Sequence, residues 1–137
     1  MTKAPREPRP SLSRADVDEF EMVASQLERF QGELQILAKG KGTDVLNRFK
    51  LDMLNILLRR ANVLLGTKYA AIVGFTEFDP DQLPSTSDTV LVVSQYLGAL
   101  EKLRTDNIYD EYGTWYWMIG GQKSASRTAA PAKLGKK

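Results

Sequence analysis

The 137-residue sequence contains neither cysteine nor histidine. Without cysteine, disulfides, iron–sulfur clusters and thiolate zinc sites are excluded, and the composition fits a reducing compartment. Histidine most readily transfers protons near neutral pH and is the commonest metal ligand, so its absence excludes the usual catalytic triads, dyads and zinc sites. We therefore expect a protein that is not an enzyme and that takes no cofactor, metal or small-molecule substrate. A carboxylate enzyme using a divalent metal is the remaining catalytic alternative, but the acidic residues are scattered along the expected helices.

Long apolar runs are also missing from the sequence. No stretch approaches the roughly 20 apolar residues that span a bilayer. The basic residues 1–14 are not followed by the apolar segment of a secretory signal. Hydrophobic residues make up 42% and charged residues 26%, close to the average of globular chains, and the length suits one domain. We expect a soluble cytoplasmic protein without membrane contacts.

The net charge of +2 is unevenly distributed along the chain. Residues 1–14 carry +3 and residues 120–137 carry +5, so that residues 15–119 carry −6. Closely spaced prolines in the first segment, and the scarcity of apolar residues in the last, predict disordered tails over residues 1–13 and 120–137. These tails either keep the protein soluble or contact the phosphates of a nucleic acid. The candidate nucleic-acid contacts are Lys3, Arg6, Arg9, Arg14, Lys123, Arg127, Lys133, Lys136 and Lys137.

The spacing of apolar residues predicts three helices in the body. The first should span about residues 14–38, with Ser13 as N-cap. The second should span about 44–65, starting after Thr43. The third should start at Ser87 or Asp88 and end between residues 104 and 108. Gly98, inside this last helix, suggests a close approach of two helices.

Apolar side chains cover most of the circumference of the second expected helix, and its polar stripe is narrow. A surface helix of a monomer shows a narrower apolar stripe, so this helix is either central or part of an interface. This broad apolar surface is the main reason to expect a protein partner or a homo-oligomer. Lys50, Arg59 and Arg60 are candidate contacts to such a partner, although snorkelling or local pairing also explains them. Arg48 and Asp52 should form a local ion pair.

Aromatic residues are concentrated between residues 109 and 119. They form either a docking surface for a partner or a flap that closes the core. The candidate partner contacts are Tyr109, Tyr112, Trp115, Tyr116 and Trp117. Residues 114–119 favour β-structure, and residues 70–75 form an apolar run of strand length, so a two-stranded pairing of these segments is one alternative.

Together these features predict a mainly α fold, a small three-helix or four-element bundle over residues 14–119 with disordered basic tails. The expected function is that of a helical binding or assembly subunit in a larger complex or homo-oligomer. A nucleic-acid-associated protein that uses its basic tails is the first alternative.

Overall fold

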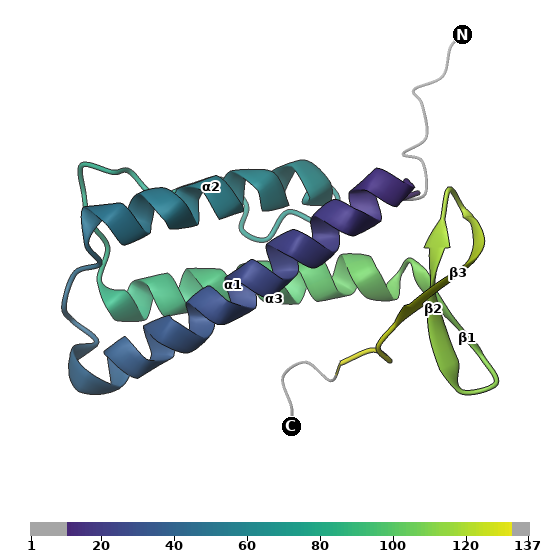
Figure 1. Ribbon diagram of the computed structural model, residues 1–137. Coiled ribbons are helices and arrows are strands. Elements are labelled where there is room, and N and C mark those ends of the chain that lie inside the picture. The colour runs from purple at the N-terminus through teal and green to yellow at the C-terminus, as the bar shows by residue number, and fades with distance from the viewer. Residues whose placement is uncertain (1–10, 133–137) are drawn as a thin grey trace, which may run out of the picture.

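A computed structural model describes residues 11–132 of the chain. Three helices, α1 (Arg14–Lys41), α2 (Arg48–Leu65) and α3 (Thr86–Thr105), are followed by an antiparallel sheet of β1 (Ile108–Glu111), β2 (Thr114–Ile119) and β3 (Gln122–Thr128). The helices lie side by side, and the sheet lies across one end of them (Figure 1). The fold is therefore α+β, and the prediction of a mainly α bundle is wrong.

Helix α1 begins where the sequence predicts. Ser13 Oγ accepts a hydrogen bond from the Asp16 amide at 3.1 Å, and the Asp16 carboxylate accepts one from the Ser13 amide at 3.0 Å. This reciprocal capping box satisfies two of the amides that a helix start leaves without partners. The far end runs to Lys41, a little past the expected residue 38.

Helix α2 begins at Arg48, so its predicted start at residue 44 is wrong. The segment before it is extended, and Leu46 donates to the Pro84 carbonyl at 2.8 Å while Thr86 donates to the Asp44 carbonyl at 2.7 Å. Asn47 is the cap, because its Oδ1 accepts from the Lys50 amide at 2.8 Å. The two segments that lead into α2 and α3 thus pair with each other instead of extending a helix.

The core lies between the three helices and continues to the sheet. Helix α1 contributes Val23 and Leu27, and α2 contributes Leu51, Leu54 and Leu58, each 0% exposed. Tyr96 of α3 is also fully buried, and its hydroxyl donates to Asn62 Oδ1 at 2.9 Å. A buried tyrosine needs such a partner for its polar end.

The sheet is built from two consecutive tight hairpins. Tyr112 and Gly113 turn the first with φ of 55° and 86°, and Gly120 and Gly121 turn the second with φ of 63° and 76°. Positive φ at both central residues is the turn that matches the twist of paired strands. Strand formation by residues 114–119 is confirmed, but residues 70–75 form no strand, so the proposed pairing of the two is wrong. A short hairpin costs less chain entropy than a pairing across some 40 residues.

The expected C-terminal tail is partly structured. Gln122–Thr128 forms β3, so the prediction of disorder from residue 120 onward is wrong for this segment. The described end of the N-terminal tail is also attached, because Leu12 is 6% exposed and its carbonyl accepts from the Gly120 amide at 2.8 Å.

Candidate binding surfaces

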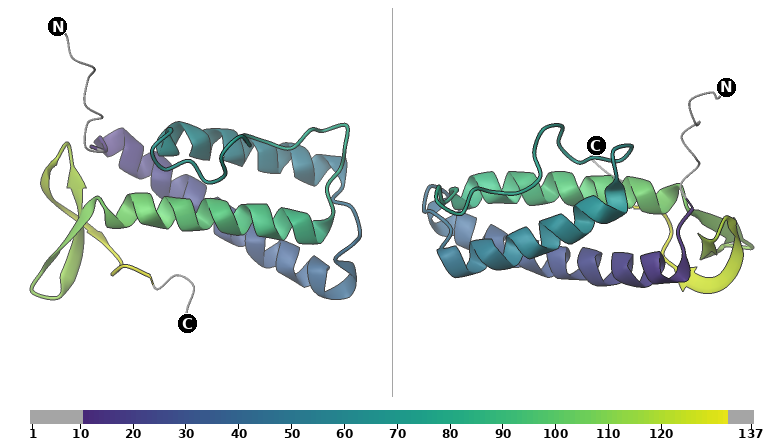
Figure 2. Two further views of the ribbon diagram at one scale, coloured as in Figure 1. Left: turned by 180° about the vertical axis from the view of Figure 1, so that it is seen from behind. Right: turned by 90° about the horizontal axis from the view of Figure 1, so that it is seen from above.

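Two asparagines of the polar stripe of α2 contact the connection 66–85. Asn55 is 4% exposed, donates to the Phe78 carbonyl at 2.9 Å and accepts from the Phe78 amide at 3.0 Å. Asn62 donates to the Thr76 carbonyl at 2.9 Å. The connection runs back along the helices in this way (Figure 2). Asn55 and Asn62 therefore hold the connection in place.

A second face of α2 carries large apolar side chains with no cover from the described chain. We call this face the outer stripe; it consists of Phe49, Met53, Ile56 and Val63, which are 71%, 48%, 48% and 84% exposed. The opposite face of the same helix is fully buried in the core. Large exposed apolar patches on monomeric proteins commonly mark interaction sites.

The three cations predicted to contact a partner lie around this helix. Arg60 forms a two-pronged ion pair with Glu19 of α1, at 2.7 and 2.8 Å. The hydrogen bond from Arg60 is the main cause that lowers the pKa of Glu19 below its usual value. Arg59 pairs with Glu77 at 2.8 Å, and Lys50 is half-buried. The pairing of Arg48 with Asp52 is confirmed at 3.3 Å. Local pairing thus accounts for both Arg59 and Arg60.

The predicted aromatic docking residues are separated by the pleat of the sheet. Trp117 is 1% exposed, packs edge-on against Phe20 at 5.2 Å and donates to Glu21 at 3.2 Å. Trp115 packs partly against the same core. Tyr112 stands at the tip of the first hairpin, 99% exposed. The tryptophans close the core, as the flap alternative expected, and do not form a shared surface with the tyrosines.

Tyr109 and Tyr116 form a cross-strand pair on the other face of the sheet. Their rings stack with centroids 5.5 Å apart, and the Lys123 ammonium lies 5.3 Å from the centre of the Tyr109 ring. Arg127 is the β3 neighbour of Tyr116. Two of the basic residues that the sequence placed in a tail therefore lie on a strand beside two aromatic rings.

Of the other basic residues proposed to contact nucleic acid, Arg14 opens α1 and is exposed. The rest lie outside the described residues: Lys3, Arg6, Arg9, Lys133, Lys136 and Lys137.

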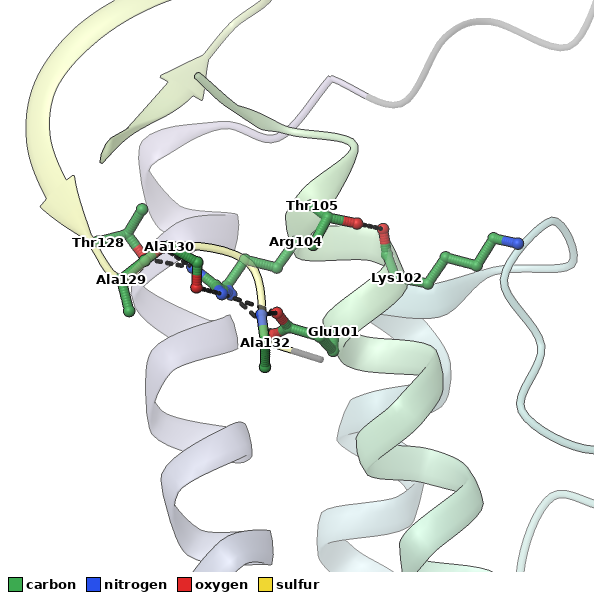
Figure 3. A network of polar contacts seen from close by, with 8 residues as sticks. All are labelled: Glu101, Lys102, Arg104, Thr105, Thr128, Ala129, Ala130 and Ala132. Carbon is green, nitrogen blue, oxygen red and sulfur yellow. Dashed lines mark hydrogen bonds and ion pairs between the residues drawn. The ribbon is translucent and has the colours of Figure 1, made fainter. Parts of the chain in front are cut away.

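Sequence reasoning missed an arginine that fastens the end of the chain to α3. Arg104 is 7% exposed and forms a two-pronged pair with Glu101, at 2.9 and 2.7 Å. The same guanidinium donates to Thr128 Oγ1 at 2.8 Å, to the Ala129 carbonyl at 2.7 Å and to the Ala130 carbonyl at 2.9 Å (Figure 3). We call residues 128–132 the strap.

The Glu101 carboxylate also accepts a hydrogen bond from the Ala132 amide at 2.8 Å. Burial alone would raise the pKa of Glu101, but the hydrogen bonds from Arg104 and Ala132 and the charge of Arg104 outweigh it, and the pKa is lowered. No local sequence signal pointed to the contacts with the strap, because they join residues 24 to 31 positions apart.

Comparison with protein-family models, with curated proteins and with solved structures finds no match for this chain. Within residues 11–132, no three His, Cys, Asp or Glu side chains gather as metal ligands would. None of the described helices has the length and apolar character needed to span a membrane. The function therefore has to be argued from the surfaces above.

Proposed function

We propose that the protein is a non-enzymatic assembly subunit that binds through the outer stripe of α2, and that the stripe pairs with the same stripe of a second copy. The carrying observation is the exposure of four large apolar side chains on a helix whose opposite face is buried in the core. Removing such side chains from water stabilises a complex by roughly 25 cal/mol per Å² of apolar area.

The positions of the four residues fit a partner helix. They follow one another at intervals of four, three and seven residues, which keeps them on one line along α2. A line of this period is the seam along which two helices pack at a crossing angle of about 20°.

Antiparallel pairing around a two-fold axis at Ile56 also matches the apolar positions. It brings Phe49 level with Val63 of the second copy. This contact occurs twice because a two-fold interface is self-complementary. The complementarity favours a second copy over an unrelated helix as the occupant.

Sedimentation equilibrium of the full chain tests this pairing. The monomer mass is 15.3 kDa, and we expect a species of twice that mass that dissociates on dilution. Ile56→Glu places two like charges at the axis and should yield monomers. Ile36→Glu, at a 70% exposed apolar position of α1, is the matched control and should leave the dimer intact.

A dimer that survives Ile56→Glu would contradict the role of the outer stripe. A wild-type chain that stays monomeric at high concentration would contradict self-pairing, and would leave a helix of another protein as the occupant.

A second candidate function, binding of single-stranded nucleic acid, is favoured by the Tyr109–Tyr116 pair with Lys123 and Arg127. Aromatic rings can stack on bases while cations contact phosphates. In fluorescence anisotropy with labelled oligothymidylate, Tyr116→Ala should weaken binding and Tyr112→Ala should not. Lys123→Ala should reduce the salt dependence, and binding that ignores all three changes would contradict this role.

A further inference from the structure

A groove of about 760 Å³ runs between α1 and α3, away from the outer stripe. Its walls are mainly apolar and include Phe20, Ala24, Leu97 and Trp117. Glu21 and Glu28 lie along the α1 side. A concave apolar surface with a few convergent polar groups is the usual form of a binding site.

The strap already occupies the sheet end of this groove in the manner of a bound peptide. Arg104 donates to the carbonyls of Ala129 and Ala130, and Glu101 accepts from the amide of Ala132. All three contacts are to backbone groups, and the strap passes between α1 and α3 (Figure 3). This end of the groove is therefore shaped to hold extended chain largely irrespective of its side chains.

Farther along, Gln31 lines the groove, but its side-chain oxygen is not accessible from it. Gln31 is 8% exposed; its Nε2 donates to the Val90 carbonyl at 3.2 Å and to Ser94 Oγ at 2.6 Å. Its Oε1 is closed off from solvent and receives no hydrogen bond from residues 11–132. The Val90 carbonyl fixes this orientation, because it can only accept. Buried polar atoms nearly always have a partner, so Gln31 Oε1 lacks an N–H or O–H donor.

Gly98 of α3 keeps the middle of the groove open. A Cβ at this position would meet no atom within 4 Å, so the expectation that Gly98 permits a close helix approach is wrong. A glycine inside a helix costs about 1 kcal/mol relative to alanine. What its missing side chain provides here is space facing Leu97, Ser94 and the groove.

We propose that this groove binds an extended peptide segment of a partner protein, which continues the path begun by the strap. Small or apolar side chains of the peptide lie on the walls, and a lysine or arginine faces Glu28 and Glu21. Arg104 and Glu101 bind the strap through its backbone, which favours an extended occupant. The carboxylates of Glu21 and Glu28 favour a basic one.

Selection from a phage-displayed library of random ten-residue peptides, with the full chain as bait, provides the probe. We expect enriched peptides that combine a basic residue with small or apolar neighbours. Gly98→Leu adds a side chain at the edge of the groove, starting from a Cβ that meets no atom within 4 Å, and should weaken these peptides at least tenfold. Gly32→Leu is the matched control, because Gly32 also lies in a helix with open space around its Cβ, and it should leave affinity unchanged.

Glu28→Gln is a second variant that keeps the side-chain size and removes a negative charge from the α1 wall, and it should weaken the same peptides while circular dichroism remains that of the wild type. Failure to enrich any peptide over a Gly98→Leu bait would overturn the proposal. Peptides that bind Gly98→Leu and Glu28→Gln as well as the wild type would overturn it too. Peptides that bind Gly98→Leu but no longer bind Ile56→Glu would be bound by the outer stripe, and this result would also overturn the proposal.

Discussion

Helix α2 and strand β2 both concentrate large apolar side chains, but the fold covers Trp117 of β2 and leaves one face of α2 open. Trp117 in β2 is 1% exposed, whereas Ile56 in α2 is 48% exposed. A strand sends alternate side chains to one layer, and α1 supplies that layer through Phe20. A helix spreads its side chains around a circumference, so an apolar helix needs cover on several sides. Helices α1 and α3 and the connection 66–85 leave the outer stripe of α2 exposed.

The largest effect should come from the covered side of this comparison. Trp117→Ala should lower the free energy of unfolding by about 3–5 kcal/mol, because it leaves a cavity beside Phe20. Tyr112→Ala, at the exposed hairpin tip, should change it by less than about 0.5 kcal/mol. Urea unfolding followed by circular dichroism measures both. Equal losses at the two positions would mean that Trp117 is not part of the core.

The two faces of α2 give the same contrast within one helix. Leu58→Ala, on the buried face, should cost about 2–5 kcal/mol. Ile56→Ala, on the outer stripe, should cost less than about 0.5 kcal/mol in dilute solution, where pairing does not add to stability. Denaturant titrations at low and high protein concentration separate the stability of the single chain from the stability that pairing adds. A large loss for Ile56→Ala at low concentration would indicate that the described chain covers the stripe after all.

The same comparison can be made between the buried ion pair of Arg104 and the exposed ion pair of Arg48. Arg104→Met removes every contact of the guanidinium with the strap and leaves Glu101 without its cation, so it should cost about 2–3 kcal/mol. Arg48→Met breaks an exposed pair and should cost less than about 0.5 kcal/mol. Amide hydrogen exchange should also become faster at Ala132 in Arg104→Met. Unchanged exchange there would mean that Arg104 does not hold the strap.

A smaller effect should follow from acidification. The pKa of folded Glu101 is lowered from 4.5, so this carboxylate stabilises the fold fully above about pH 4.5, and the contribution disappears as pH falls through the lowered value. The Ala132 amide resonance should report this titration with a midpoint below pH 4.5, and Glu101→Gln should abolish it. A midpoint above 4.5 would contradict the network.

Much of the helical part could be predicted from the sequence, because its signals are local. The capping box at Ser13 fixed the start of α1, and the apolar circumference of α2 predicted surface that one short chain leaves uncovered. The start of α2 was misjudged because Thr43 and Asn47 both make good caps. The choice between them depends on the pairing of residues 44–46 with residues 84–86, which lies outside any local window.

The sheet and the strap were missed for different reasons. Gly120-Gly121 was a usable hairpin signal, but the following strand is almost entirely polar and resembles a solvated tail. Tyr112-Gly113 is an unusual pair for the turn it forms. Arg104 contacts residues 24 to 26 positions away, and no spacing rule connects them. The interpretation of Gly98 failed because a helical glycine marks either a close approach or an open space, and the sequence does not distinguish them.

Directed cross-linking tests the central claim, that the outer stripe pairs with itself, most directly. The natural chain has no cysteine, so Ile56→Cys introduces a single thiol at the proposed two-fold axis. A disulfide forms without distortion only when the two Cα atoms lie within about 7 Å. Under mild oxidation, Ile56→Cys should run as a dimer on a non-reducing gel, and the exposed control Ile36→Cys should stay monomeric. An uncross-linked Ile56→Cys, or equal cross-linking of both variants, would contradict the account.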